Sequence, residues 1–285
     1  MFRPILLCSL LLALVAGTSS LAADTEALEL KVMTYNLRFA SAQPPNAWPE
    51  RRPHMVALIT REAPDVFGTQ EGLYGQLRDL AAGLPHYEWI GLGRAGGSQD
   101  EFAAIFFRRD RFEPVAFDHF WLSDTPATVG SITWGHTFRR MVTWVRLRER
   151  NSGKEFYFWN THFDHQVEEA RQKSAELIRA RLAKLDPAMP LVVVGDFNCL
   201  AGRSRAYDIL TREAGLADTW KLAPQRENED LNSFNDFKPG KHAGERIDWI
   251  LARRPSAVTR AAVVSYDESV TFPSDHFPVT ATVRF

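Results

Sequence analysis

Short apolar runs rich in Val, Phe, Tyr and Trp recur along most of the chain, and they limit its fold more than any other feature. Runs of this composition favour β-strands. A chain with many strands and a few helices between them is expected to pack its sheets together and place helices outside, in an α/β (α+β) arrangement. The predicted strands cover residues 30–35, 65–69, 102–107, 141–147, 156–160, 191–194, 247–251, 261–265 and 278–283.

Three segments have the residue spacing of helices. Apolar residues between Pro53 and Pro64 recur at helical intervals, and Pro64 is expected to end that helix. Apolar residues from position 167 to position 185 trace one face of a longer helix whose other face is charged. A shorter helix is predicted over residues 207–214, closed by Gly215.

The N-terminus has the features of a secretory signal peptide. Arg3 precedes an apolar run over residues 5–16, and small residues follow as far as Ala22 and Ala23, where cleavage is expected. A membrane anchor is the alternative, but the run is short for crossing a bilayer. We therefore expect residues 1–22 to be removed and residues 23–285 to form a single domain without a transmembrane segment. The protein is then expected to be periplasmic or secreted.

Composition and charge narrow the class of protein. Of 285 residues, 45% are hydrophobic and 12% aromatic, which is typical of a folded chain rather than a disordered one. The net charge of −1 does not favour a protein that binds nucleic acid mainly by electrostatic attraction. A local basic groove is still compatible with this charge. Cleavage would leave Cys199 as the only cysteine, so we expect a buried thiol and no internal disulfide.

Polar blocks stand where the predicted strands end or begin. Polar residues beyond apolar strands lie where a sheet presents its rim to a ligand. Each block alone has an ordinary structural explanation, such as a turn, a helix cap or a core histidine. The blocks are Tyr35-Asn36, Gln70-Glu71, Asn160-Thr161-His162, Gly195-Asp196-Phe197-Asn198, Arg246-Ile247-Asp248 and Ser274-Asp275-His276.

Taken together, the blocks predict a metal site on grounds of charge. If the carboxylates of Glu71, Asp196, Asp248 and Asp275 converge, they repel one another and some should become protonated. A divalent cation removes this conflict. Oxygen ligands suit a hard ion, Mg²⁺ first and Mn²⁺ or Ca²⁺ next, and no set of thiolates is offered for zinc.

In this order, the blocks resemble those of the endonuclease/exonuclease/phosphatase superfamily, whose members include deoxyribonuclease-I-like enzymes. The most specific matches are Gly195-Asp196-Phe197-Asn198 and Ser274-Asp275-His276. The resemblance covers nearly the whole mature chain and is strongest to an exported bacterial subgroup. It implies a four-layer sandwich in which two mixed or antiparallel sheets are flanked by helices.

The resemblance implies a role for each matching residue. Asn36, Glu71 and Asp275 match the family's metal ligands, and we expect one Mg²⁺ or Mn²⁺ ion there. Asp196 matches the residue that orients or deprotonates the attacking water. Asn198 matches the residue that contacts the phosphate.

Two histidines match the acid–base groups of the family. His276 matches the catalytic histidine, and Asp248 matches the carboxylate that holds it. His162 matches the second histidine of the deoxyribonuclease-like branch, and Glu101 the carboxylate that orients it. A carboxylate on the remote ring nitrogen fixes the tautomer and raises the histidine pKa. We therefore expect two carboxylate–histidine pairs beside the scissile phosphate.

Arginines are the candidates for binding the substrate's phosphate. Arg140, at the start of the strand at 141–147, is expected to clamp it. Arg38 stands where some relatives have an acidic residue, which makes a second metal ion doubtful. It is expected either to bind a further phosphate or to face solvent. Arg51 and Arg52 are additional candidates.

Several other residues near the blocks have less specific expectations. Asp164 is predicted to cap the helix that follows it, with His165 in the first helical turn. Five aromatic residues in loop-like stretches are expected either to stack on a base or sugar or to cover sheet edges. They are Trp48, Trp134, Trp220, Phe234 and Phe237.

The sequence therefore predicts an exported, metal-dependent phosphoesterase, active as a monomer, that hydrolyses a phosphodiester or phosphomonoester by in-line attack of water. The partner is a phosphate ester, and a nuclease acting on DNA or RNA is the alternative substrate class. A catalytically inactive binding module with the same fold is the alternative of another class. It is disfavoured because all the acid–base residues are present.

Overall fold

The computed structural model describes residues 27–238, 246–267 and 271–285, so the predicted signal peptide lies outside the described residues. Its elements alternate between strands and helices, with strands in the majority. Along the chain they are β1 (Glu29–Asn36), α1 (Trp48–Glu62), β2 (Val66–Gly72), α2 (Tyr74–Gly83), β3 (Tyr87–Ile90), β4 (Phe102–Arg108), β5 (Phe112–Trp121), β6 (Met141–Glu149), β7 (Glu155–His162), α3 (Glu168–Leu182), β8 (Leu191–Asp196), α4 (Arg205–Asp208), the π-helical turn η1 (Ile209–Glu213), β9 (Leu216–Asp218), α5 (Thr219–Leu222), β10 (Gln225–Glu227), β11 (Asp248–Arg253), β12 (Ala257–Val263) and β13 (Val279–Arg284).

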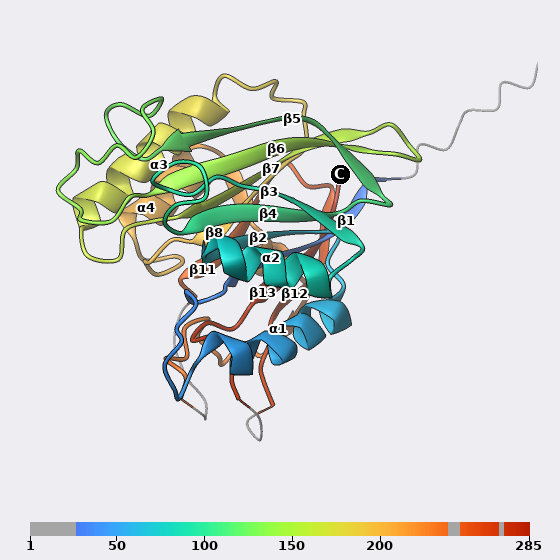
Figure 1. Cartoon of the computed structure of the whole chain (residues 1–285). Helices are drawn as coiled ribbons and strands as arrows, with labels where there is room; N and C mark the ends of the chain where they lie inside the picture. Colours follow the sequence, from blue (N-terminus) through green and yellow to red (C-terminus); the bar gives the residue numbers. More distant parts are fainter. Residues whose placement is uncertain (1–26, 239–245, 268–270) are drawn as a thin grey trace, which may run out of the picture.

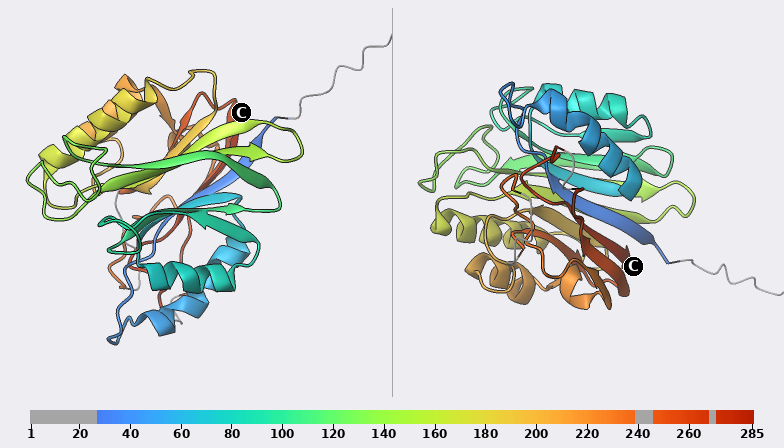
Figure 2. Two further views of the ribbon diagram at one scale, coloured as in Figure 1. Left: turned by 45° about the horizontal axis from the view of Figure 1, so that its top comes forward. Right: turned by 90° about the horizontal axis from the view of Figure 1, so that it is seen from below.

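Two mixed β-sheets pack face to face, with helices outside both (Figures 1 and 2). One sheet has 7 strands in the order β10-β12-β13-β1-β2-β4-β3, and the other has 6 in the order β5-β6-β7-β8-β11-β9. Helices α1 and α2 lie on the outer side of the first sheet, and α3 and α4 lie beside the second (Figure 1). The predicted α/β sandwich of two sheets flanked by helices is confirmed.

The hydrophobic core lies mainly between the two sheets. Val32 and Val66 from the first sheet and Val145 and Val194 from the second belong to one buried cluster. A second cluster joins the outer face of the second sheet to α3, α4 and η1 and includes the fully buried Trp249. Burying both faces of the central strands leaves their ends as the places where polar side chains can gather.

The strand predictions were correct for every run named above, but four strands were missed. These are β3, β5, β9 and β10, which are short or lie at or near a sheet edge. Strand β5 contains Pro114, and its pairing with β6 shifts register between Pro114 and Ala116. Proline cannot donate to a ladder and is tolerated at such edges and bulges.

Helix α1 begins at Trp48, earlier than Pro53 suggested, and ends before Pro64 as predicted.

Strand register brings the site residues together from distant parts of the chain. Strand β8 pairs in parallel with β7, which places His162 opposite Asp196, and antiparallel with β11, which places Asp248 opposite the same residue. A Cβ atom on Gly195 would lie 2.4 Å from the carbonyl oxygen of Thr161. Only glycine therefore allows β7 and β8 to approach this closely beside Asp196.

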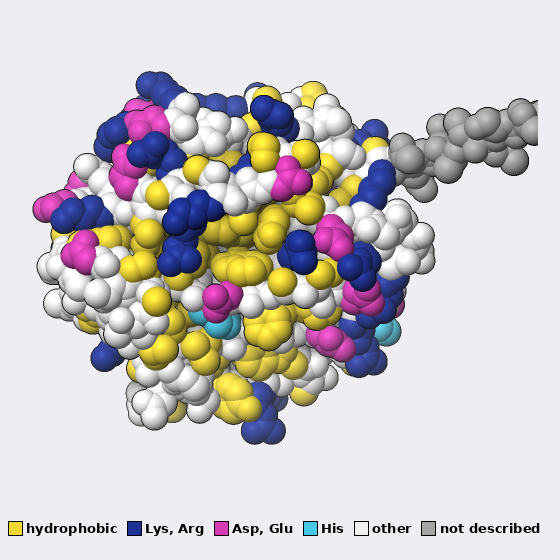
Figure 3. Space-filling model, turned by 90° about the horizontal axis from the view of Figure 1, so that it is seen from above, with side chains coloured by type: hydrophobic (Ala, Val, Ile, Leu, Met, Phe, Trp, Pro, Cys, Tyr) yellow, Lys and Arg dark blue, Asp and Glu magenta, His cyan; other side chains and the backbone are white. Residues whose placement is uncertain are grey.

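The outer face of the second sheet is only partly covered by helix. Trp144 and Tyr157 alternate with the core residues Val145 and Phe158, so their rings point outward, with centroids 5.8 Å apart. Seen from above, hydrophobic side chains form a band across the middle of the molecule, with arginines and acidic residues around it (Figure 3). None of the helices within the described ranges has both the length and the apolar character needed to cross a bilayer.

Candidate active site

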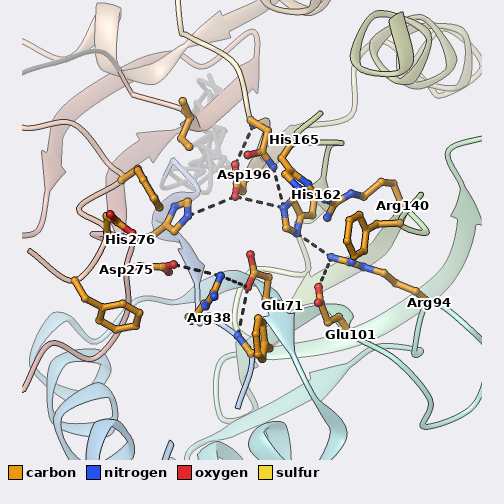
Figure 4. Close-up of a pocket in the computed structure, with 17 residues that line it drawn as sticks. Arg38, Glu71, Arg94, Glu101, Arg140, His162, His165, Asp196, Asp275 and His276 are labelled. Atoms are coloured by element: carbon orange, nitrogen blue, oxygen red, sulfur yellow. Dashed lines mark hydrogen bonds and ion pairs between the residues drawn. The ribbon is translucent and has the colours of Figure 1, made fainter. Parts of the chain in front are cut away.

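A pocket of about 550 Å³ opens beside the ends of β1, β2, β7 and β8 (Figure 4). Nine of the eleven predicted site residues line it, and the other two, Asn36 and Asp248, contact the lining residues from behind. The lining residues are Arg38, Phe39, Glu71, Arg94, Glu101, Phe138, Arg140, His162, His165, Asp196, Asn198, Phe234, Asp236, Phe237, Ile247, Asp275 and His276.

Asp196 stands between two histidines at the centre of the pocket. Its Oδ2 lies 3.7 Å from Nε2 of His276 and 3.4 Å from Nε2 of His162. On the far side of His276, Nδ1 lies 2.9 Å from Oδ2 of Asp248, as expected for that pair. Asn198, two residues after Asp196, turns its side chain to the same place, with Nδ2 2.9 Å from Nε2 of His162.

The buried charges around His276 set the protonation states of this group. Burial alone would lower the pKa of His276, but the carboxylates of Asp248 and Asp196 raise it to about 10. Burial and the charge of Asp248 raise the pKa of Asp196 to about 7. Near neutral pH the site therefore holds a protonated imidazole beside a carboxyl group that can gain or lose a proton, which is the pairing needed for acid–base chemistry.

Carboxylates and Asn36 form the opposite wall. Nδ2 of Asn36 lies 3.0 Å from Oε1 of Glu71 and 2.9 Å from Oδ2 of Asp196, and Oδ1 of Asn36 accepts the N–H of Arg38 at 2.9 Å. Thus the amide nitrogen of Asn36, not its oxygen, faces the carboxylates. Nη1 of Arg38 lies 3.5 Å from Oδ2 of Asp275 and 3.9 Å from Oε2 of Glu71.

The donors on this wall fit a divalent metal ion. Burial and the neighbouring Glu71 raise the pKa of Asp275. Burial acts in the same direction on Glu71, but the hydrogen bond from Asn36 and the charges of His276 and Arg38 lower its pKa overall. Ligand atoms of Glu71, His162 and Asp196 lie within 4.8 Å of one another. Carboxylate oxygens that repel each other are the ligands of a hard divalent ion. The three predicted ligands meet at this wall, with Arg38 bridging Glu71 and Asp275.

The predicted contact between Glu101 and His162 is wrong, because Arg94 lies between them (Figure 4). Nη2 of Arg94 lies 2.8 Å from Nδ1 of His162 and 2.8 Å from Oε2 of Glu101. Arginine can only donate, so Nδ1 of His162 accepts and the ring proton sits on Nε2, toward Asp196. The amide nitrogen of Asn198 cannot accept this proton at 2.9 Å, so this tautomer requires the Asn198 amide to turn its oxygen toward the ring. Burial and the charges of Arg140 and Arg94 hold the pKa of His162 well below its ordinary value. His162 is therefore a neutral donor, not a second imidazolium.

Arg140 lines the pocket as predicted, in a cationic corner that it shares with Arg94. Its side chain is almost fully buried, and Nη2 lies 3.0 Å from Nδ1 of His165. Asp164 accepts the N–H groups of Gln166 and Val167, so it closes a turn ahead of α3. The predicted helix cap at Asp164 is wrong, because α3 begins after Val167 and no side chain caps its first turn. His165 precedes the helix instead of lying in its first turn, and it lines the pocket.

The other two arginine candidates do not reach the pocket. Arg51 is fully buried, and its guanidinium donates to the carbonyl oxygens of Asn46, Leu37, Pro273, Arg38 and Phe39. Arg52 instead faces Asp79 on the surface, at 3.5 Å. Arg51 therefore holds the loop after β1 in place and is not available to bind a phosphate.

Five residues that line the pocket have a left-handed backbone although none is glycine. The φ angles are 51° at Arg38, 62° at Glu71, 49° at Asn198, 54° at Asp236 and 55° at Phe237. This conformation costs energy for a side chain with a Cβ and persists where surrounding contacts enforce it. Arg51 supplies such contacts for Arg38, whose own carbonyl oxygen it binds at 3.0 Å.

Aromatic side chains form the rim of the pocket. Phe39, Phe138 and Phe234 are partly exposed there, and the ring of Phe234 packs against His276 at 5.1 Å between centroids. Of the five loop aromatics named above, only Phe234 and Phe237 line the pocket. Trp48 is buried at the start of α1 and Trp134 is buried in the loop after β5.

Sequence reasoning missed Arg94, His165, Phe39 and Phe138. Arg94 lies in a glycine-rich stretch after β3 that has neither strand nor helix periodicity, so no local pattern marks it. His165 lies three residues after His162 in the sequence. That nearness to the block Asn160-Thr161-His162 was the one sequence signal that could have placed His165 in the site. Asn160 itself is structural, since its Nδ2 donates to the carbonyl oxygens of Thr69 and Ala104.

Comparison with known proteins agrees with this geometry. The profile of the Endonuclease/Exonuclease/phosphatase family matches residues 33–276. The chain belongs to this family. Family membership makes it a phosphoesterase or nuclease by class, and the acidic and histidine groups of the pocket are consistent with the divalent-metal dependence general in the family.

Two solved bacterial structures of the family are similar over nearly their whole length. An endonuclease/exonuclease/phosphatase family protein of Bacteroides thetaiotaomicron is 33% identical, with a TM-score of 0.85 over 91% of this chain and 99% of that one. A mannosyl-6-phosphatase of the same organism is 34% identical, with a TM-score of 0.84 over 90% of this chain and 100% of that one.

More distant similarities extend to eukaryotes and a virus. The human Nocturnin catalytic domain shares the fold, with a TM-score of 0.69 at 19% identity over 90% of this chain and 94% of that domain. A protein of Acanthamoeba polyphaga mimivirus is 31% identical over 160 residues, or 53% of this chain. The match spans 59% of the viral protein's length.

Proposed function

We propose that this protein is a divalent-metal-dependent hydrolase that cleaves a small phosphomonoester by in-line attack of water. The observation that carries the proposal is the position of Asp196 between His276 and His162, facing a wall of metal-ligand type on one side and a cationic corner on the other. A phosphate held between these walls would have water activation on one side and charge stabilisation around it.

Each residue of the pocket has a separate role in the proposed reaction. Asp196, ionised above its pKa of about 7, orients the attacking water and accepts its proton. Nε2–H of His162 and Nδ2 of Asn198 donate to non-bridging oxygens of the phosphate. His276, kept protonated by Asp248, stabilises the developing negative charge. Arg94 and Arg140 attract the phosphate dianion into the corner.

Glu71 and Asp275, with Asn36 after rotation of its amide, would hold one Mg²⁺ or Mn²⁺ ion. Bound there, the ion would supply Lewis-acid stabilisation of charge on the phosphate oxygens. Arg38 takes the position at which an acidic residue would be needed for a second ion, which supports a single ion.

A sugar phosphate is the substrate class that the pocket supports best. A pocket of about 550 Å³ is large enough for a sugar phosphate. The partly exposed Phe138 and Phe234 at its rim offer flat apolar surfaces for a sugar ring. The similarity to a mannosyl-6-phosphatase over 90% of this chain supports a monoester. The net charge of −1 gives no general attraction for a long polyanion.

Hydrolysis of nucleic acid is the alternative substrate class, and a substrate comparison separates the two. Turnover of mannose 6-phosphate, bis-p-nitrophenyl phosphate and duplex DNA would be measured with Mn²⁺ at several salt concentrations, with Asp196→Asn as the inactive control. We expect the monoester to have the highest kcat/KM and a weak salt dependence. The monoester proposal would be rejected if duplex DNA is cleaved faster and if log kcat/KM for DNA falls with log salt concentration more steeply than about four phosphate contacts would cause.

The inactive binding module, the alternative of another class, predicts binding without turnover. If the wild-type protein binds Mn²⁺ and phosphate but releases no more phosphate than Asp196→Asn, the module is the correct interpretation. The enzyme is supported instead by Asp196, His276 and His162 in one pocket, with Asp248 behind His276.

We also propose that the protein is exported to the periplasm or medium and acts as a monomer. The apolar run over residues 5–16 supports export. Fractionation of cells expressing the full chain, with mass spectrometry of the purified N-terminus, tests the proposal. Recovery of an uncleaved protein from the cytoplasm would reject it.

A further inference from the structure

Arg38 extends its guanidinium between the two carboxylates that the proposed metal site needs. Its Nη1 lies 3.5 Å from Oδ2 of Asp275 and 3.9 Å from Oε2 of Glu71, and Figure 4 shows the three side chains pointing toward one another. The side chain is 41% exposed and the two carboxylates are mostly buried, at 8% and 15%. The partly exposed guanidinium of Arg38 therefore lies beside two carboxylates that are mostly buried, those of Asp275 and Glu71.

The backbone under Arg38 is fixed, so only its side chain is free to move. Its N–H donates to Oδ1 of Asn36, and its carbonyl oxygen accepts from Arg51 at 3.0 Å and from Gln76 at 3.0 Å. These contacts hold the left-handed φ of 51°. The guanidinium itself lies over the ring of Phe39, 4.4 Å from its centroid, at the mouth of the pocket.

From this arrangement we infer that Arg38 is an internal cation that competes with the divalent ion for Glu71 and Asp275. The inference rests on the proposed metal site. When the ion binds, the guanidinium gives up the two carboxylates and is free to pair with a phosphate in the pocket. Arg38 therefore weakens metal binding by itself, and an anionic ligand that takes up Arg38 relieves that weakening, which couples the two binding events.

The sign of this effect separates the inference from a simpler role. If Arg38 were only a phosphate clamp, its removal would leave metal affinity unchanged. If it held the ligands in position, its removal would weaken metal binding. Competition alone predicts that removal of the positive charge makes metal binding tighter, by up to about fivefold for a partly exposed ion pair.

The test is the Kd of Mn²⁺, measured by calorimetry or electron paramagnetic resonance on the chelator-treated full-length protein. Arg38→Gln is the variant, because glutamine has a similar length and no charge, and it meets the same left-handed backbone cost as arginine. Arg52→Gln is the matched control, since Arg52 is also exposed and lies 3.5 Å from a carboxylate, that of Asp79, outside the pocket.

We expect Arg38→Gln to bind Mn²⁺ more tightly than wild type, Arg38→Lys to resemble wild type, and Arg52→Gln to show no change. Inorganic phosphate should tighten Mn²⁺ binding more in wild type than in Arg38→Gln. Equal or weaker Mn²⁺ binding by a folded Arg38→Gln protein would overturn the inference. Absence of Mn²⁺ binding by the wild type is a different result, because it would reject the proposed metal site itself.

Discussion

Replacing Asp248 by asparagine tests the charge arrangement around His276. The substitution keeps the shape of the side chain, and the backbone N–H of residue 248 still donates to Oγ of Ser233 at 3.1 Å. It removes the carboxylate with the largest effect among the three that raise the pKa of His276 to about 10, and one of the causes that raise the pKa of Asp196 to about 7. Both pKa values should fall.

The size of the shift follows from the contact that is lost. Nδ1 of His276 and Oδ2 of Asp248 lie 2.9 Å apart, and a hydrogen bond to a charged group contributes about 1.5–3 kcal/mol. At about 1.4 kcal/mol per pKa unit, the pKa of His276 should fall by roughly one to two units. Activity needs ionised Asp196 and protonated His276, so the acidic and basic limbs of the profile report these two groups.

The assay is kcat/KM against pH for p-nitrophenyl phosphate at saturating Mn²⁺. In Asp248→Asn both limbs of the pH profile should move to lower pH. On the acidic side, activity should appear at a lower pH than in wild type, because Asp196 ionises at a lower pH. On the basic side, activity should also be lost at a lower pH, because His276 loses its proton at a lower pH. Asp110→Asn, which removes an exposed carboxylate paired with Arg108, should leave the limbs in place. A uniform fall in activity with both limbs unmoved would refute the electrostatic role of Asp248.

Three further predictions concern the surroundings of the pocket. Arg94→Met should lower kcat at least tenfold by releasing the ring of His162, and urea unfolding should show a loss of about 1–3 kcal/mol, because the partly buried carboxylate of Glu101 loses its partner; wild-type kcat would contradict this. Glu71→Gln should weaken Mn²⁺ binding at least tenfold in calorimetry, and chelator should abolish wild-type turnover; full activity in excess chelator would exclude a metal-dependent reaction. Arg51→Met should lower the free energy of unfolding by about 3–5 kcal/mol, since five carbonyl oxygens lose their donor, and a change below 1 kcal/mol would show that they are not dependent on it.

The central strands could be predicted because their signal is local. Strand β8 is a continuous apolar run that ends in Gly195 and Asp196, and it is buried along its whole length. Strand β5 could not be predicted, because its residues are partly exposed and Pro114 interrupts the pattern. It is a strand because β6 provides a partner along one side, and this pairing is a tertiary contact that has no trace in the local sequence.

The site residues could be predicted to the extent that each one follows or begins a strand. Asp196, His162 and Asp248 meet because the strands that carry them are neighbours in register. The partner of His162 could not be predicted. Glu101 and Arg94 are seven positions apart in an irregular loop, and only the folded loop shows that the guanidinium stands between carboxylate and ring.

Arg51 and Arg94 show why the geometry of this pocket extends beyond the residues that do chemistry. Both guanidinium groups are buried. Arg51 binds carbonyl oxygens behind the pocket, and Arg94, which lines the pocket, binds His162 and Glu101. Nε of Arg94 has no hydrogen-bond partner, but the bonds that each buried guanidinium group does make restrict the groups that it binds. Arg51 restricts the strained loop that presents Arg38, and Arg94 restricts the tautomer and orientation of His162. Substitution of Arg51 should therefore alter catalysis while every group that contacts the substrate stays in place, whereas substitution of Arg94 also removes a positive charge that lines the pocket.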